Sequence, residues 1–233
     1  MRVFRNDKLI ESRARIGRIS GFAGLGLLFA GLFISFRPEY FLYAYLVLIL
    51  GIILASIGTY NASKWLASPR ADEALEIALK GLDNKHLLYN YLLPAEHVLL
   101  SPYGVYVFIV KRLDGRITCE GERWRQKFSF LRLLQGMSRE RLGNPTQDLR
   151  WAMDRVRQLL EPEVGDEEVP IAGMIVFSND KAELDVTGSP VPVLPAKKLK
   201  RHLRSAFKAG RRLPEDTRRE LERILDEKTG QGN

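Results

Sequence analysis

The side chains most clearly suited to binding a ligand are Lys and Arg, which cluster in two regions of the chain. Residues 111–157 hold twelve Lys or Arg against six Asp or Glu, and residues 187–214 hold eight Lys or Arg and no acid. Clustered ammonium and guanidinium groups bind phosphates, along a nucleic-acid backbone or on anionic lipid headgroups. For the second region we favour contact with lipid. Contact with nucleic acid and a helix face that is simply solvated remain alternatives. The candidate residues are Lys197, Lys198, Lys200, Arg201 and Arg204.

Several other chemistries lack their residues in this sequence. Cys119 is the only cysteine, so the chain can form neither an internal disulfide nor a cysteine-rich zinc site, and a reduced thiol suits the cytoplasm. No glycine-rich phosphate loop and no nucleophile elbow occurs.

Composition indicates a globular protein with an uneven charge distribution. Of the 233 residues, 45% are hydrophobic and 27% charged, which excludes a largely disordered or collagen-like chain. Residues 1–70 carry nine Lys or Arg against three Asp or Glu, and so supply most of the net charge of +8. The basic character is mainly a property of the N-terminal part, which makes it weak evidence for nucleic-acid binding.

Two apolar segments in that N-terminal part predict a transmembrane helical hairpin. Residues 19–36 and 40–60 carry no charged side chain, and as helices they would extend roughly 27 and 31 Å, close to the ~30 Å hydrocarbon thickness of a bilayer. Only Arg37, Pro38 and Glu39 separate them, which leaves room for a tight turn alone. Glycines within the first segment would let the two helices approach closely.

The charges that flank the two segments predict their orientation. Residues 1–18 hold six Lys or Arg against two acids, the second segment is followed by Lys64 and Arg70, and the turn contains a single Arg. Positive flanks stay in the cytoplasm, so we expect a two-span protein of the cell membrane with both termini cytoplasmic. A cleaved signal peptide is the competing explanation of the first segment, but a second span follows at once, which favours the hairpin.

The rest of the chain alternates between helical and extended patterns. Apolar spacing predicts helices at 71–82, 145–160, 196–208 and 215–228, and β-branched or aromatic runs predict strands at 86–93, 97–100, 104–111, 116–120, 122–125, 171–177 and 191–194. Asn144 can cap a helix that begins at Pro145. This order predicts an α/β domain with a mixed sheet and flanking helices.

Part of this domain resembles a known family. The segments AEHVLLSPYGVYVFIVKRLDGRI (95–117), NPTQ (144–147) and VPIAGMIVFSNDKAELDV (169–186), together with Trp124, resemble the NERD (nuclease-related) domain. The resemblance covers roughly residues 68–205. It implies a restriction-endonuclease-like fold of the PD-(D/E)xK type, often attached to membrane spans.

The resemblance also implies a site chemistry. In such a site two carboxylates on adjacent strands hold Mg²⁺, which polarises the scissile phosphate, and a lysine orients or helps to deprotonate the attacking water. The first acid corresponds to Glu96, the histidine after it to His97 and the lysine to Lys111, while the motif of the next helix corresponds to Asn144, Pro145 and Gln147.

The second acid of this pattern is replaced by Ile109, which has no oxygen to offer a metal. Glu96 alone is a poor ligand set for a strongly hydrated ion. Either an acid has moved in from a neighbouring element, with Asp72, Glu73 and Asp148 as candidates, or the site is inactive and the fold serves in binding, which we favour.

Each motif residue also has a purely structural explanation. Glu96 can be a solvated acid at a strand edge, Lys111 a charge where a buried strand emerges, and His97 a half-buried strand residue. Asn144 and Pro145 need only start a helix. An apolar residue at 109 strengthens these explanations, because it restores an ordinary buried strand.

The expected organisation is a basic cytoplasmic N-terminus (1–18), two transmembrane helices (19–60), a NERD-like domain (68–205) and a C-terminal helical tail (206–233). The predicted function is a membrane-anchored cytoplasmic NERD-like domain, catalytically impaired and acting in binding or assembly. The alternative is an active Mg²⁺-dependent nuclease on DNA or RNA with a relocated second acid, so enzyme status stays open and Mg²⁺ is the cofactor only if the site is active. Expected partners are membrane lipid, nucleic acid and a protein yet to be identified.

Overall fold

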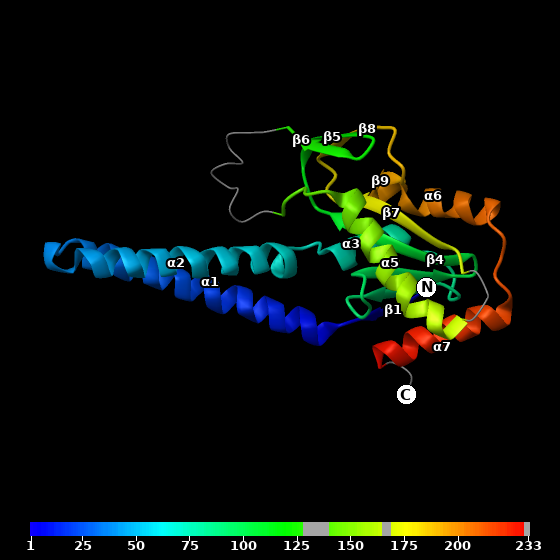
Figure 1. The fold of residues 1–233 in the computed structure, drawn as a ribbon, viewed down its shortest axis with the longest axis horizontal. Helices are drawn as coiled ribbons and strands as arrows, with labels where there is room; N and C mark the ends of the chain where they lie inside the picture. The colour runs from blue at the N-terminus through cyan, green and yellow to red at the C-terminus, as the bar shows by residue number, and fades with distance from the viewer. Residues whose placement is uncertain (128–139, 165–168, 231–233) are drawn as a thin grey trace. The chain divides into compact units, whose positions relative to one another are not determined.

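The computed structural model describes residues 1–127, 140–164 and 169–230 (Figure 1). The chain divides into two units, each described by itself. Asp7–Arg70 form a helical hairpin, and the sheet domain is built from Met1–Asn6, Ala71–Lys127 and the residues from Leu142 onward. Residues 128–139, which belong to the first basic region, lie outside the described residues.

The main sheet of the sheet domain has six strands in the order β1-β2-β3-β4-β7-β9. Antiparallel pairing joins β2 to β3 and β3 to β4, whereas β1 is parallel to β2, β7 to β4 and β9 to β7. The sheet is therefore mixed, as the sequence predicts. The strands are β1 (Arg2–Arg5), β2 (Leu87–Asn90), β3 (His97–Ser101), β4 (Gly104–Lys111), β7 (Ile171–Phe177) and β9 (Val193–Pro195).

Helices cover both faces of this sheet (Figure 1). Val105 and Val107 of β4 lie in a core with α5 (Pro145–Val164) and α7 (Glu215–Thr229). Tyr106 and Phe108, which alternate with them, lie in a second core with α3 (Ala71–Leu79) and α6 (Ala196–Ala209). A strand covered on both faces is apolar along its length, which explains the continuous apolar run in β4.

A smaller sheet of three strands has the order β6-β5-β8. β5 (Gly115–Glu120) and β6 (Arg123–Gln126) form the predicted hairpin around Gly121, whose φ of 61° suits glycine. β8 (Ala182–Thr187) pairs parallel to β5 and was not among the predicted strands. Its alternate residues, Glu183 among them, are exposed, so β8 lacks the apolar run that marks β4 and β7.

The first residues of the chain, for which no strand was predicted, form β1, which extends the main sheet at one edge. The Phe4 ring stacks on Tyr89 of β2 with centroids 5.1 Å apart. The Arg5 guanidinium lies 3.5 Å from the carboxylate of Asp72, whose side chain is fully buried at the start of α3. Because β1 precedes the hairpin and α3 follows it, both ends of the hairpin connect to one domain.

The hairpin consists of α1 (Asp7–Ser35) and α2 (Phe41–Asn61), joined through a 3-10 turn (η1, Pro38–Tyr40) and followed by a π-helical segment (η2, Ala62–Leu66). α1 begins well before the apolar segment at 19–36, because the charged residues ahead of that segment continue the helix. Both helices are long and apolar enough to cross a membrane by length and composition. A Cβ on Gly24 would come within 2.8 Å of the Ala55 Cα atom, so the two helices approach closely at this glycine.

Candidate functional site

The strand that carries Lys111 places it on the α5 face of the main sheet, together with Ile109. Lys111 is the last residue of β4, and its side chain is 13% exposed. Its Nζ atom lies 3.5 Å from Oδ2 of Asp148, on the first turns of α5. Of the three acids that the sequence offers as replacements for the missing one, Asp148 is therefore brought to the lysine.

Ile109 packs in the manner of an ordinary core residue. It is partly buried and contacts the apolar cluster that includes Leu149 and Val156 of α5. In the parallel pairing of β4 with β7, Ile109 lies opposite Ile175. At the position where the family pattern has an acid, the sheet domain therefore has an aliphatic side chain packed on the core.

Glu96 lies in the bend that leads into β3, one residue before the strand, and it is exposed. Its carbonyl oxygen accepts a hydrogen bond of 2.7 Å from the backbone N–H of Tyr91. The ladder ends with His97 paired to Phe108, and the same register continued by one residue would set Glu96 opposite Ile109. On that register Glu96 belongs with the α5 face.

His97 faces the opposite side of the sheet, as the alternation of β3 requires. It is buried, its Nδ1 atom lies 2.8 Å from Oδ1 of Asn90, and its ring packs edge-on against Tyr91 at 4.9 Å. Although His97 is adjacent to Glu96 in sequence, the two side chains belong to different faces. This arrangement corresponds to a structural role for the histidine.

Asp72 and Glu73 begin α3, the helix that covers the face opposite to Lys111. The Asp72 carboxylate lies 3.5 Å from the Arg5 guanidinium. Arg5 was not identified as a partner from sequence, because the entire hairpin separates it from Asp72 and no local pattern links them. The structure places neither acid on the Lys111 face.

The NPTQ segment forms the start of α5. The Asn144 Oδ1 atom accepts a hydrogen bond of 3.2 Å from the backbone N–H of Gln147, which makes Asn144 a side-chain cap, and Pro145 is the first residue of the helix. The Gln147 residue is exposed. This start positions Asp148 one residue later, beside Lys111.

These residues do not fit a metal centre. Among the residues that the structure describes, no group of three His, Cys, Asp or Glu side chains is arranged to hold an ion. The acid next to Lys111 is in an ion pair with it, and Ile109 contributes no oxygen. A strongly hydrated cation such as Mg²⁺ needs more oxygen ligands than this arrangement offers.

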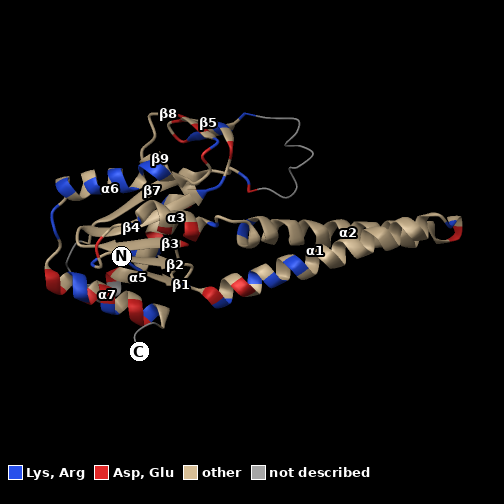
Figure 2. Cartoon of the chain, turned by 180° about the vertical axis from the view of Figure 1, so that it is seen from behind, with Lys and Arg blue, Asp and Glu red and all other residues tan. Residues whose placement is uncertain are grey.

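The second basic region forms α6, which is marked by blue segments in Figure 2. Leu199, Leu203 and Phe207 are buried in the core, and basic side chains occupy the outer face. Lys200 Nζ donates to the Lys80 carbonyl oxygen (2.7 Å), and Arg204 donates to the Gly81 carbonyl oxygen (3.4 Å). Two of the five predicted basic residues thus also satisfy carbonyl groups just past the end of α3.

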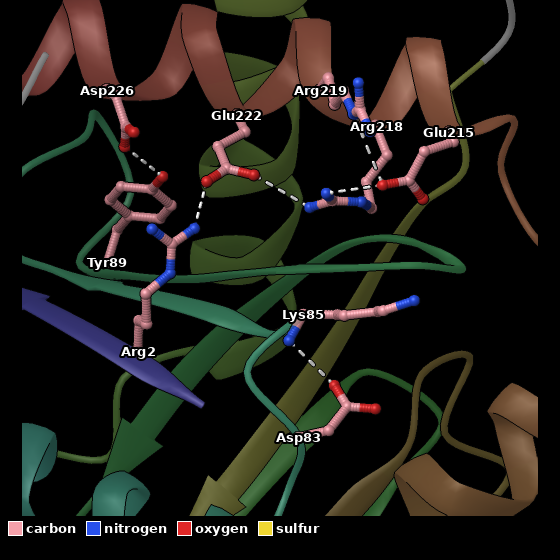
Figure 3. Close-up of polar contacts among 9 residues, drawn as sticks. All are labelled: Arg2, Asp83, Lys85, Tyr89, Glu215, Arg218, Arg219, Glu222 and Asp226. Atoms are coloured by element: carbon pink, nitrogen blue, oxygen red, sulfur yellow. Dashed lines mark hydrogen bonds and ion pairs between the residues drawn. The ribbon is translucent and has the colours of Figure 1, made fainter.

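A polar network on the α5 face attaches α7 to β1 and β2 (Figure 3). The Tyr89 hydroxyl donates to Asp226 (2.6 Å), and Arg2 forms an ion pair with Glu222. Burial, and then the hydrogen bond to Asp226, raise the pKa of Tyr89 far above its usual value. No local sequence pattern predicts this network, because its residues come from β1, β2 and α7, and it attaches the helix rather than forming a site.

A second ion-pair group belongs to α7 itself. Arg218 lies 3.0 Å from Glu215 and 2.9 Å from Glu222 (Figure 3). The hydrogen bond from Arg218 lowers the pKa of Glu215. The arginines of α7 are therefore paired with acids of the same helix.

Comparison with known proteins gives one match. The model of the nuclease-related domain family (NERD) matches residues 65–178, a range that includes α3, the strands β2 to β7 and the Lys111–Asp148 pair. No curated protein and no solved structure matches the chain. The family comparison thus identifies a nuclease-related domain (NERD) at residues 65–178 of this chain.

Proposed function

We propose that this chain is a membrane-anchored protein whose nuclease-related domain acts by binding and not by metal-dependent cleavage of nucleic acid. The proposal rests on the side chains around Lys111, where an ion pair and an aliphatic residue stand in place of a pair of metal-binding acids. Lys111 Nζ is 3.5 Å from Asp148 Oδ2, and Ile109 is packed on the core in place of an acid.

The chemistry of phosphodiester cleavage supports this proposal. A metal nuclease needs carboxylate oxygens that hold the ion and stabilise the attacking and leaving oxygens. Of the two motif acids only Glu96 is present, in the bend before β3, and Asp148 neutralises the lysine that would otherwise assist the water. The side chains that remain can hold the fold together and can contact a partner.

The surface of the hairpin supports membrane anchoring. Phe22 and Phe33 of α1 and Leu42 of α2 are at least 70% exposed within the structure. Apolar side chains that point outward along two long helices fit a hydrocarbon environment better than water. This exposure differs from that of a core helix in a soluble protein, whose apolar residues are buried.

The connectivity of β1 supports the proposed topology. β1 and α3 belong to the same domain, so both ends of the hairpin must return to the side of the membrane where that domain folds. Basic flanking residues put that side in the cytoplasm. Removal of the first segment as a signal peptide would also remove β1 from the sheet, which argues for retention.

A second candidate function rests on the same ion pair. Asp148 can be the relocated acid of an active Mg²⁺-dependent nuclease, with Glu96 as the other ligand and Lys111 beside them. The two functions make opposite predictions for cleavage.

The test is cleavage of labelled DNA and RNA by the purified full chain with Mg²⁺ or Mn²⁺. We expect the wild type to cleave no faster than Lys111→Ala or Asp148→Asn, with Lys181→Ala, an exposed lysine elsewhere, as the matched control. Metal-dependent cleavage that Lys181→Ala keeps and both site variants lose would overturn the binding proposal and establish the nuclease.

A further inference from the structure

The outer face of α6 carries a straight row of cations. Lys197, Arg201, Arg204 and Lys208 follow the spacing i, i+4, i+7 and i+11, which places them along one side of a helix over roughly 16 Å. The opposite side holds the buried Leu199, Leu203 and Phe207. Arg211 and Arg212 follow directly after the helix, and no acid occurs between Asp185 and Glu215.

Most cations of this region are not neutralised within the protein. Among the residues that the structure describes, five of these cations form no ion pair: Lys198, Arg201, Lys208, Arg211 and Arg212. The Lys197 Nζ atom lies 4.0 Å from Oδ1 of Asp180, which is a long distance for an ion pair. The arginines of α7 are the contrast, because Arg218, Arg219 and Arg223 all pair with glutamates of their own helix. α6 is therefore the basic helix left available for an external anion.

The fold fixes this row rigidly. The apolar side of α6 is already used in the core, and Lys200 and Arg204 are hydrogen-bonded to carbonyl groups after α3. The helix cannot insert an apolar face into a bilayer as a free amphipathic helix does. Its contact with a partner is therefore electrostatic and superficial.

The nature of α6 favours lipid over nucleic acid as the partner. Binding of single-stranded nucleic acid depends on exposed aromatic side chains that stack on bases. Phe207 is the one Phe, Tyr or Trp of α6, and it is buried and stacked on Tyr103 with ring centroids 5.0 Å apart. A row of cations without stacking groups suits the headgroups of a charged surface.

The short links between the hairpin and the sheet domain also favour lipid as the partner of α6. One residue, Asn6, separates β1 from α1, and residues 67–70 separate η2 from α3. With residues 19–60 in a bilayer, as proposed above, these short links and the charged first turns of α1 limit how far the sheet domain can lie from the membrane surface. Lipid headgroups are then the anions available at the highest local concentration.

We propose that the outer face of α6, built by Lys197, Arg201 and Lys208, binds anionic phospholipid headgroups and holds the sheet domain against the cytoplasmic leaflet. This inference rests on the proposed membrane anchoring. The contact is lost when salt screens the charges or when the row is neutralised.

The test places the full chain in lipid nanodiscs and measures energy transfer from a dye on α6 to labelled headgroups. The dye is attached at Ser205→Cys, an exposed position of α6. Cys119 is buried, and this burial raises the pKa of its thiol, so it stays unreactive during labelling. We expect higher transfer in discs that contain phosphatidylglycerol than in phosphatidylcholine discs, with loss of the difference in about 0.5 M salt.

Two variants of equal charge make the test specific. Neutralising the row by Lys197→Gln, Arg201→Gln and Lys208→Gln should remove the dependence on phosphatidylglycerol. The matched variant Arg219→Gln, Arg223→Gln and Lys228→Gln on α7 should keep it. Circular dichroism of both variants checks that they are folded.

Four results would overturn the inference. Transfer that is equal in both kinds of disc, or a row variant that behaves as wild type, excludes a headgroup contact through α6. Binding of a labelled oligonucleotide that needs the row, without any effect of phosphatidylglycerol, assigns the row to nucleic acid. If the chain elutes separately from both kinds of disc, the hairpin does not anchor it in the membrane. The elution profile thus distinguishes a failure of membrane anchoring from a failure of α6 to bind headgroups.

Discussion

Lys111 obtains its acid from a helix and not from its own strand. β4 is apolar along its length, so the lysine at its end emerges from a core with little exposed surface, 13% of the side chain. Asp148 reaches this lysine because the Asn144 cap and Pro145 start α5 beside the end of the strand. A charge that leaves a core in this way is stabilised by a nearby opposite charge, and the pair needs no metal.

The Lys111–Asp148 pair should contribute to stability. Asp148→Asn removes the charge opposite the largely buried Lys111 side chain, and we expect a loss of about 1 kcal/mol in the free energy of unfolding. A double-mutant cycle with Lys111→Met, followed by urea unfolding, measures the coupling between the two side chains. Coupling close to zero would show that the pair does not stabilise the fold.

Tyr89 should make the sheet domain sensitive to alkaline pH. Burial and the hydrogen bond to Asp226 raise the pKa of Tyr89 above its ordinary value of 10.0. The stabilisation it provides is complete below pH 10 and is lost as the pH rises, because the tyrosine of the unfolded chain then ionises while the buried one does not. Urea unfolding between about pH 8 and about pH 11 should show a steeper loss of stability in the wild type than in Tyr89→Phe.

At neutral pH the same substitution has a smaller and separate effect. Tyr89→Phe loses the hydrogen bond to Asp226 and should cost about 1 kcal/mol. If the wild-type and Tyr89→Phe stabilities stay parallel over the whole alkaline range, the phenol does not carry the pH dependence.

At the scale of elements, α1 and α2 depend on glycines where they touch. A side chain at Gly24 would meet the backbone of Ala55, whereas a Cβ at Gly26 has no atom within 4 Å. We expect Gly24→Leu to cost about 1–3 kcal/mol by forcing the helices apart, and Gly26→Leu to be close to neutral.

Thermal unfolding of the full chain in detergent, followed by far-UV circular dichroism, checks this pair of variants. Both substitutions add the same side chain to the same helix, so differences in hydrophobicity cancel. Equal melting temperatures for Gly24→Leu and Gly26→Leu would mean that α1 and α2 do not pack through Gly24.

The elements differ in how far sequence alone predicts them. β4 and β7 are predicted with their observed bounds, because a strand covered on both faces needs an unbroken apolar run. β1 is missed, since its four residues include two arginines and look like the basic flank of a membrane span. β8 is missed because half of its residues are exposed to solvent. Half-exposed edge strands are formed by pairing with distant strands, which no local pattern records.

Sequence also predicts only part of the candidate site. The resemblance to the NERD family locates Glu96 and Lys111, and alternation along β4 puts Ile109 and Lys111 on one face. The sequence leaves Asp72, Glu73 and Asp148 as candidates for a replacement acid. Only the packing of α5 and α3 on opposite faces separates them, with Asp148 beside Lys111 and Asp72 beside Arg5.

At the scale of the whole molecule, the hairpin is an insertion into the sheet domain. The first strand of the sheet precedes it and the rest of the domain follows it. In the proposed topology the sheet domain is completed only after both helices have entered the membrane and α3 has returned to the side of β1. In that proposed topology the order of the chain couples membrane insertion to folding of the sheet domain.

We propose that the described residues of the nuclease-related domain form no site for a catalytic divalent cation. The most direct measurement is titration of the full chain with Mn²⁺, with the free ion followed by electron paramagnetic resonance. We predict that the wild type, Glu96→Gln and Asp148→Asn leave the same free Mn²⁺ up to about 1 mM, because carboxylate oxygens suited to Mg²⁺ and Mn²⁺ are too few around Lys111. A saturable site in the wild type that both Glu96→Gln and Asp148→Asn abolish would contradict this account.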